Sequence, residues 1–141
     1  MHESDGFRRL DRQECLRLLV RAPVGRLVYT RQALPAVLPV NFSLDSDSSV
    51  VLRTSAGSDL VHAVDGVVVA FEADDFAPAH HSGWSVIVTG RATVVTDSAE
   101  RQRLSRTGPR SWTPIADPVF VRIESELVTG RELVGTGART A

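Results

Sequence analysis

VGRLVYT at residues 24–30 begins a series of β-branched runs that decides the expected fold of this 141-residue chain. PAVLPVNFSL at 35–44 and SVVLRT at 49–54 follow it at short intervals. RQAL at residues 31–34 is a plausible turn, and DSDS at residues 45–48 is a strong turn signal. The pattern therefore predicts three strands joined by tight connections, which indicates an antiparallel meander.

Further strands are expected along the rest of the chain. Val67 to Glu72 is a nearly continuous apolar run, which predicts a strand buried on both faces, and 74–82 is expected to be a loop. Residues 83–96 read as one long strand with a bulge or bend at Gly90. The last two strands are expected at 118–124 and 128–133.

Short helices are expected at three places. Asp11 and Glu14 form a capping box ahead of an apolar stripe, and Pro23 ends that helix. The stripe consists of Cys15, Leu16, Leu19 and Val20. Ser58 is expected to cap a second helix, which buries Leu60, Val61 and Val64, and 97–100 carries the capping chemistry of a third. Residues 1–9 and 135–141 are polar or small and are expected to be flexible ends of a single domain covering 1–141.

These elements predict a mainly β fold: a six- to seven-stranded antiparallel barrel, closed or half-closed, with short helices. The alternation of strands and helices that marks a parallel sheet is missing. A net charge of −1 gives no field to recruit nucleic acid, and no apolar run is long enough to cross a bilayer. The single cysteine, Cys15, has no internal disulfide partner, and no signal-peptide pattern opens the chain, so a cytoplasmic location is expected.

Six short segments carry a resemblance to a known family. They are APVGRL (22–27), LPVNF (38–42), LRTSAGS (52–58), VAFE (69–72), SGWSV (82–86) and VTGR (128–131). In this order the chain resembles the pyridoxamine 5'-phosphate oxidase-like family of flavin-binding split barrels. The resemblance extends from residue 10 to about residue 133.

The resemblance implies a homodimer with flavin sites at the subunit interface. FMN is the implied cofactor, with a deazaflavin coenzyme or no cofactor as alternatives, and a small-molecule redox partner is implied as substrate. The implied cofactor-binding residues are Pro39, Val40, Asn41, Arg53, Thr54, Ser58, Trp84 and Ser85. No metal site is implied, and the catalytic residues are left unassigned, because the cofactor does the redox chemistry.

The physical chemistry of the segment 53–58 supports a phosphate there. Gly57 allows close approach of the backbone, Ser58 adds a hydroxyl, and Arg53 offers a bidentate cation. Asp59 departs from the family, because many relatives carry lysine there and this chain has no lysine at all. A carboxylate about 4 Å from a phosphate would oppose binding by roughly 4 kcal/mol at an effective dielectric of about 20.

Other interpretations of these residues stay open. Arg53 fits a surface or interface ion pair, Trp84 fits packing in a dimer interface, and Asn41 fits a hydrogen bond at a strand end. His80 and His81 are adjacent and point to opposite sides of an extended segment, so they are expected in a solvated loop rather than on a metal.

Three functions are consistent with the sequence. They are a flavin- or deazaflavin-dependent oxidoreductase, a non-enzymatic flavin-binding or sensing dimer, and a degenerate barrel without cofactor. A true pyridoxamine phosphate oxidase is not expected, because its second phosphate site is represented here only by Arg122 and Arg131. Ser85 lacks a nucleophile elbow, which argues against a hydrolase.

Overall fold

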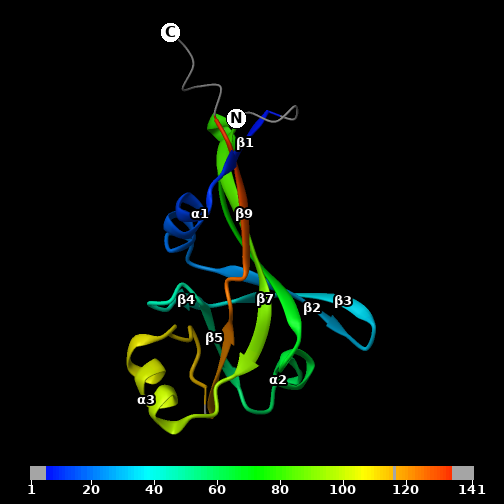
Figure 1. The fold of residues 1–141 in the computed structure, drawn as a ribbon, viewed down its shortest axis with the longest axis vertical. Helices are drawn as coiled ribbons and strands as arrows, with labels where there is room; N and C mark the ends of the chain where they lie inside the picture. The colour runs from blue at the N-terminus through cyan, green and yellow to red at the C-terminus, as the bar shows by residue number, and fades with distance from the viewer. Residues whose placement is uncertain (1–5, 116, 135–141) are drawn as a thin grey trace.

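Among residues 6–115 and 117–134, which the computed structural model describes, nine strands form one curled antiparallel sheet with short helices at its margins (Figure 1). The strands are β1 (Phe7–Leu10), β2 (Gly25–Arg31), β3 (Leu34–Val40), β4 (Phe42–Leu44), β5 (Val50–Ser55), β6 (Val68–Ala77), β7 (Ser82–Val94), β8 (Pro118–Ile123) and β9 (Leu127–Leu133). The helices are α1 (Arg12–Leu19), α2 (Asp59–Val64) and α3 (Ser98–Thr107), with a 3-10 turn at Pro78–His80. The expected mainly β half-barrel is confirmed, but it has nine strands rather than six or seven, since β1 and the short β4 were not expected as separate strands.

The strand order is β3-β2-β6-β7-β8-β5-β4, with β9 and then β1 branching from β7. In Figure 1, β1 and β9 lie side by side along the upper arm, the β2–β3 hairpin projects to the right, and α2 and α3 lie at opposite sides of the lower part. The two end strands of the order, β3 and β4, are consecutive in the chain and meet at Asn41. The sheet therefore curls so that its two edges come together at this residue.

This order corrects the expected meander. The run 35–44 is two strands rather than one, because the backbone leaves the sheet at Asn41: β3 pairs with β2, and β4 pairs with β5. Both halves have the same β-branched character, so the sequence pattern could not show that they belong to opposite edges of the sheet.

Three further expectations were wrong. Phe7–Leu10 is a strand paired with β9, not a flexible end. Residues 74–77 continue β6 and pair with β7, so the loop is only the turn around Pro78–His80. The run 67–72 is buried on one face only, because Val67 and Val68 are 42% and 54% exposed while Val69 and Phe71 lie in the core. The expectations for residues 1–5 and 135–141 lie outside the described residues.

The helix starts follow the predicted capping chemistry. Asp11 and Glu14 form both bonds of the capping box of α1, and Asp97 caps α3 by accepting from the backbone N–H of Glu100. Of the α1 stripe, Cys15 and Leu19 are fully buried, whereas Val20 is 62% exposed and lies outside the core. Burial raises the pKa of the Cys15 thiol, which therefore stays protonated at neutral pH and serves as packing.

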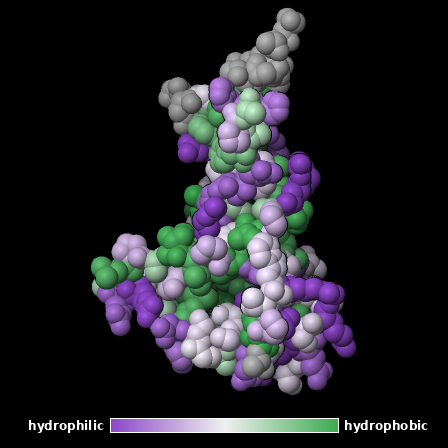
Figure 2. All heavy atoms as spheres, turned by 180° about the vertical axis from the view of Figure 1, so that it is seen from behind, coloured by the Kyte–Doolittle hydropathy of each residue, from purple (hydrophilic) through white to green (hydrophobic). Residues whose placement is uncertain are grey.

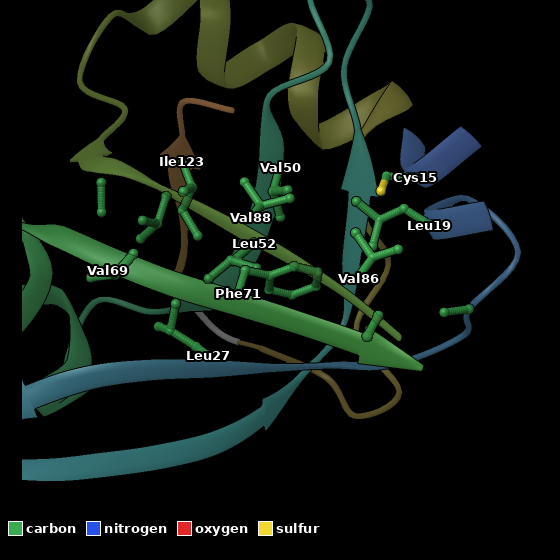
Figure 3. Close-up of a cluster of buried hydrophobic side chains, with 14 of the residues drawn as sticks. Cys15, Leu19, Leu27, Val50, Leu52, Val69, Phe71, Val86, Val88 and Ile123 are labelled. Carbon is green, nitrogen blue, oxygen red and sulfur yellow. The ribbon is translucent and has the colours of Figure 1, made fainter. Parts of the chain in front are cut away.

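The main core lies inside the curl and is centred on Phe71 (Figure 3). Leu27, Leu52 and Val88 surround this ring in the close-up, and the Phe42 ring lies 4.7 Å from it, centroid to centroid. Gly25 makes room for it, because a Cβ at this position would lie 2.0 Å from Phe71 Cζ. The core thus joins strands from both edges of the curled sheet and holds the edges near Asn41 together.

A close approach of two backbones explains Gly90. A Cβ here would lie 1.7 Å from the Glu124 carbonyl oxygen. Near this residue β7 changes its partner from β9 to β8. The predicted bend at Gly90 is therefore the point where the upper arm joins the lower part of the sheet.

Candidate functional site

The segment from Arg53 to Ser58 lies where β5 ends and α2 begins. The Ser58 hydroxyl accepts from the Leu60 N–H at 3.2 Å, and the Ser58 N–H donates to the Ser55 carbonyl at 3.1 Å. Leu60 and Val64 are buried and anchor the helix to the core. The predicted capping role of Ser58 is confirmed, and it fixes the turn that follows Arg53.

Arg53 is held against the side of the sheet that faces α3. Arg53 pairs with Phe120 across β5 and β8, and its guanidinium carbon lies 5.7 Å from the Phe120 ring centroid. Its Nε is buried and has no hydrogen-bond partner among the described residues. An orphaned buried donor is uncommon in a folded protein and calls for an acceptor. Arg53 is therefore the described residue with the strongest structural indication of a ligand contact.

Asn41 and Thr54 lie beside Arg53. The register of β4 and β5 pairs Phe42 with Leu52, so Asn41 comes one position further along, next to Arg53. Thr54 follows on the other face of β5, since successive side chains alternate. The edges of the curled sheet thus bring Asn41 to the start of the 53–58 segment.

Pro39 and Val40 reach the same corner from β3. They pair with Arg26 and Gly25 of β2, and Val40 packs against the main core. Six of the eight predicted cofactor residues therefore lie along the β3–β4 junction and the β5–α2 turn.

Trp84 and Ser85 lie elsewhere in the chain. They are neighbours on β7, so they face opposite sides of the sheet. Trp84 is 7% exposed and packs in the main core. Ser85 lies on the outer face, toward the opposite end of β7 from the residues that pair with β8. Within one chain the structure does not bring these two side chains to Arg53.

Asp59, the departure from the family, has a partner that the sequence did not reveal. Its carboxylate accepts from Arg31 at the end of β2, with a distance of 2.7 Å between Oδ2 and Nη2. The charge that would oppose a phosphate is therefore paired with a cation. Arg31 was missed because 28 residues separate the two positions in the chain, and no local pattern links them.

A second charged group lies on the outer face of the sheet. Arg26 donates through Nη1 to Glu72 and to Asp74, both at 3.1 Å. Burial, together with the neighbouring Asp74 carboxylate, raises the pKa of Glu72 to about 7. The sequence analysis missed this group because it placed Glu72 in a strand and Asp74 in a loop, whereas both lie on β6.

The two arginines named for a second phosphate site have different surroundings. Arg122 is 19% exposed and bonded to Asp45 and Glu100, so its charge serves a structural network. Arg131 lies over the Phe7 ring, 4.2 Å from guanidinium carbon to centroid, beside a cavity that Ser85 also lines. Of the two arginines, only Arg131 lines this cavity.

Residues 6–115 and 117–134 contain no cluster of three or more His, Cys, Asp or Glu side chains suited to a metal ion. No helix in the same part of the chain is both long and apolar enough to span a membrane.

Comparisons with known proteins agree with this architecture. The chain is 45% identical over 130 residues to the uncharacterized protein Rv0080 of Mycobacterium tuberculosis, covering 89% of this chain and 84% of that protein. A structure described as the FAD binding protein from Mycobacterium smegmatis has a TM-score of 0.79 at 35% identity, covering 90% of this chain and 98% of that one.

A FAD-binding protein from Mesorhizobium loti has a TM-score of 0.72 at 26% identity, covering 89% of this chain and 96% of that one. The sequence profile of the family described as pyridoxamine 5'-phosphate oxidase matches residues 11–132. This match covers both edges of the curled sheet and the 53–58 segment, and the chain belongs to the pyridoxamine 5'-phosphate oxidase-like family.

Proposed function

We propose that this chain is a flavin-binding protein and that Arg53 holds a phosphate of the nucleotide. The observation that carries the proposal is the buried Nε of Arg53, which has no hydrogen-bond partner in the part of the chain that the structure describes. The chain is 35% identical to a FAD-binding protein along almost its whole length. A phosphate oxygen is the acceptor that a guanidinium fits best. Ser58 and Asn41 supply further polar groups near Arg53, whereas Thr54 lies on the other face of β5.

The neighbouring charges fit this assignment. Asp59 is engaged by Arg31, so its repulsion of a phosphate is reduced. Gly57 has open space around its α-carbon, so the backbone of the turn is accessible to a ligand. Pro39 and Val40 offer an apolar strand end that suits a flat ring.

FAD and FMN share the phosphate and the ring that this corner would bind. We favour FAD, because two relatives of more than 25% identity are described as FAD-binding proteins. FMN, the cofactor implied by the sequence, and a deazaflavin coenzyme are the alternatives. FAD carries an adenosine monophosphate half that FMN lacks, so a comparison of their affinities distinguishes the two cofactors.

A bound flavin supplies hydride and single-electron transfer, whereas the protein positions the ring and the substrate. We propose an oxidoreductase that acts on a small-molecule substrate. A flavin-carrying or sensing protein would bind the cofactor equally well but would not turn over.

Titration of the purified chain tests the site. FAD, FMN and a deazaflavin coenzyme are each titrated into wild type, R53Q and the control R106Q, which changes an exposed arginine on α3. We expect FAD to bind, and we expect R53Q to raise its Kd about tenfold because one charge-assisted contact is lost. R106Q should bind like wild type, and equal melting temperatures show that R53Q remains folded.

The same experiment can refute the proposal. If none of the three cofactors binds at high micromolar concentration, the chain is a degenerate barrel without cofactor. If R53Q binds FAD as tightly as wild type, the phosphate lies elsewhere. Oxidation of NADH or NADPH by loaded protein under air separates the enzyme from the carrier.

We also propose that the chain forms a homodimer through the outer face of the sheet. A row of four apolar residues and one threonine crosses this face in register, from Val37 through Val28, Ala70 and Thr89 to Leu127. Val37 and Leu127 are 61% and 58% exposed. Figure 2, which shows the molecule from behind, has hydrophobic side chains on the projecting hairpin and in a hollow beside it. A face of this kind is typical of an association site.

A self-complementary face would also explain Ser85. Ser85 lies on the outer face, so we infer that it contacts a flavin bound to the partner subunit. Trp84 packs in the main core and holds β7 in place, so its effect on the flavin would be indirect. Both assignments remain predictions.

Matched valine substitutions test the dimer. Val37 and Val20 have nearly the same exposure, 61% and 62%, but Val20 lies at the end of α1. We expect V37E to shift the mass measured by light scattering from dimer to monomer and V20E to leave it unchanged. A monomeric wild type, or equal behaviour of the two variants, would contradict this interface.

A further inference from the structure

A cavity of about 280 Å³ lies between α3 and β8. We call it the α3–β8 groove, and its lining consists of Ser98, Arg101, Gln102, Ser105, Pro118 and Phe120. Sites that hold a whole small molecule begin at about 300 Å³, so the volume of this groove suits one part of a larger ligand.

The groove has a polar wall and an apolar floor. The wall is one face of α3, because its four exposed residues follow one another at spacings of three, one and three along the helix. The floor is made by Pro118 and Phe120, which are two positions apart on β8 and so share a face of the sheet. Leu104 of α3 packs with Phe120 in a small second core. This contact holds the helix beside the strand.

Arg53 lies on the same face of the sheet as the floor of the groove. Phe120 is its direct cross-strand partner, and directly paired residues share a face. The Arg53 guanidinium carbon lies 5.7 Å from the centroid of the Phe120 ring, which also lines the groove. A phosphate held by Arg53 would therefore lie next to the groove, and a group attached to that phosphate could extend into it.

The groove offers a second cation. In residues 6–115 and 117–134 the Arg101 side chain forms no hydrogen bond or ion pair, and the described lining contains no carboxylate. The nearby Glu100 carboxylate is bonded by Arg103 and Arg122. Arg101 alone would be an ordinary surface arginine. Its position beside the buried, unpartnered Nε of Arg53 instead places two guanidinium groups around one apolar floor.

We propose that the α3–β8 groove takes the adenosine monophosphate half of FAD. This inference rests on the proposed function, in which Arg53 holds a phosphate. Arg53 binds the phosphate that FAD shares with FMN, and Arg101 binds the second phosphate. The adenosine lies on Pro118 and Phe120, and the Gln102 amide, which both donates and accepts, meets its polar edge. Because FMN lacks this half, the groove contributes to the affinity of FAD alone.

Comparison of the two flavins tests the groove. FAD and FMN are titrated into wild type, R101Q and R106Q, the last of which changes an exposed arginine of α3 outside the lining. We expect wild type to bind FAD more tightly than FMN. R101Q should raise the Kd of FAD about tenfold and leave that of FMN unchanged, because only FAD loses a charge-assisted contact. R106Q should bind both flavins like wild type.

A bulky side chain tests the same assignment by filling the groove. Ser105 and Arg106 are exposed neighbours on α3, but only Ser105 lines the cavity. We expect S105W to weaken FAD binding at least tenfold without changing the Kd of FMN, and R106W to bind both flavins like wild type. Circular dichroism melting checks that α3 is intact in both variants.

Three results would overturn this inference and leave the flavin site in place. They are equal affinities of wild type for FAD and FMN, wild-type affinity for FAD in R101Q and S105W, and an equal loss of FAD and FMN binding in these variants. The last result would assign the groove to the half that the two flavins share. If wild type binds neither flavin, the proposed function fails and this inference fails with it.

Discussion

Arg31 at the end of β2 and Asp59 at the start of α2 form an ion pair of 2.7 Å, which joins the β2–β3 hairpin to the turn that follows Arg53. Both side chains are more than half exposed, so the pair itself adds little to stability. Its effect is local: it neutralises an acidic group beside the proposed phosphate position.

Replacing Asp59 should therefore strengthen flavin binding. D59K introduces the lysine that the family resemblance led us to expect, and it places two cations next to Ser58 where an ion pair now lies. We expect flavin affinity to rise several-fold, measured by fluorescence titration, with almost no change in melting temperature. E126K makes the same charge change at an exposed residue outside α2 and should leave affinity unchanged. Equal gains in both variants would indicate a general charge effect.

Asp45 should support stability at neutral pH and lose this role in acid. Arg103 and Arg122 bond its carboxylate at 2.7 and 2.9 Å, and the Arg103 bonds hold the pKa of Asp45 well below its usual range. A lowered folded-state pKa stabilises the protein above the unfolded pKa of about 3.9, and the contribution is lost as pH falls through the folded value.

D45N should consequently cost about 1–3 kcal/mol of unfolding free energy at pH 7, as expected for breaking a partly buried charged network. Urea denaturation between pH 7 and pH 3 should show the difference from wild type shrinking below about pH 4. A difference that is constant with pH would indicate that the turn geometry, not the charge, is responsible.

Glu72 should have the opposite effect to Asp45 on how stability depends on pH. Its pKa is raised to about 7, so the folded state binds more protons than the unfolded state between about pH 4.3 and 7, and stability falls as pH rises through this window. E72Q removes the titrating group. We expect the unfolding free energy of E72Q to exceed that of wild type by about 1 kcal/mol at pH 8, allowing for screening by solvent. Below about pH 4 the two proteins should be equally stable. E126Q is the control, and an advantage that does not change with pH would refute the assignment.

Gly25 should tolerate no side chain. Its Cβ would lie 2.0 Å from Phe71 Cζ, and Phe71 is fully buried. We expect G25A to lower the unfolding free energy by about 1–3 kcal/mol through overpacking. G57A has open space around its Cβ and should be nearly neutral. F71L lacks the ring atoms that the new Cβ would meet. The double variant G25A/F71L should therefore lose less unfolding free energy than the two single variants together.

Local sequence signals determined much of this protein. The β-branched runs predicted most of the strands, and Asp11, Ser58 and Asp97 predicted the helix starts, because capping depends on residues two or three positions apart. The order of short motifs was sufficient for the family. It also singled out Arg53 and Ser58, which lie on one short stretch of chain, Arg53 near the end of β5 and Ser58 at the start of α2.

Only the tertiary structure decided which distant residues meet. Nothing near residue 41 shows that β3 and β4 lie at opposite ends of one sheet, because a strand's partner depends on long-range register. For the same reason, the sequence could not show that Arg31 forms an ion pair with Asp59, or that Arg9 of β1 lies opposite Arg131 of β9. It also separated Trp84 from Ser85, since adjacent strand residues face opposite sides of the sheet, one into the core and one onto the outer face.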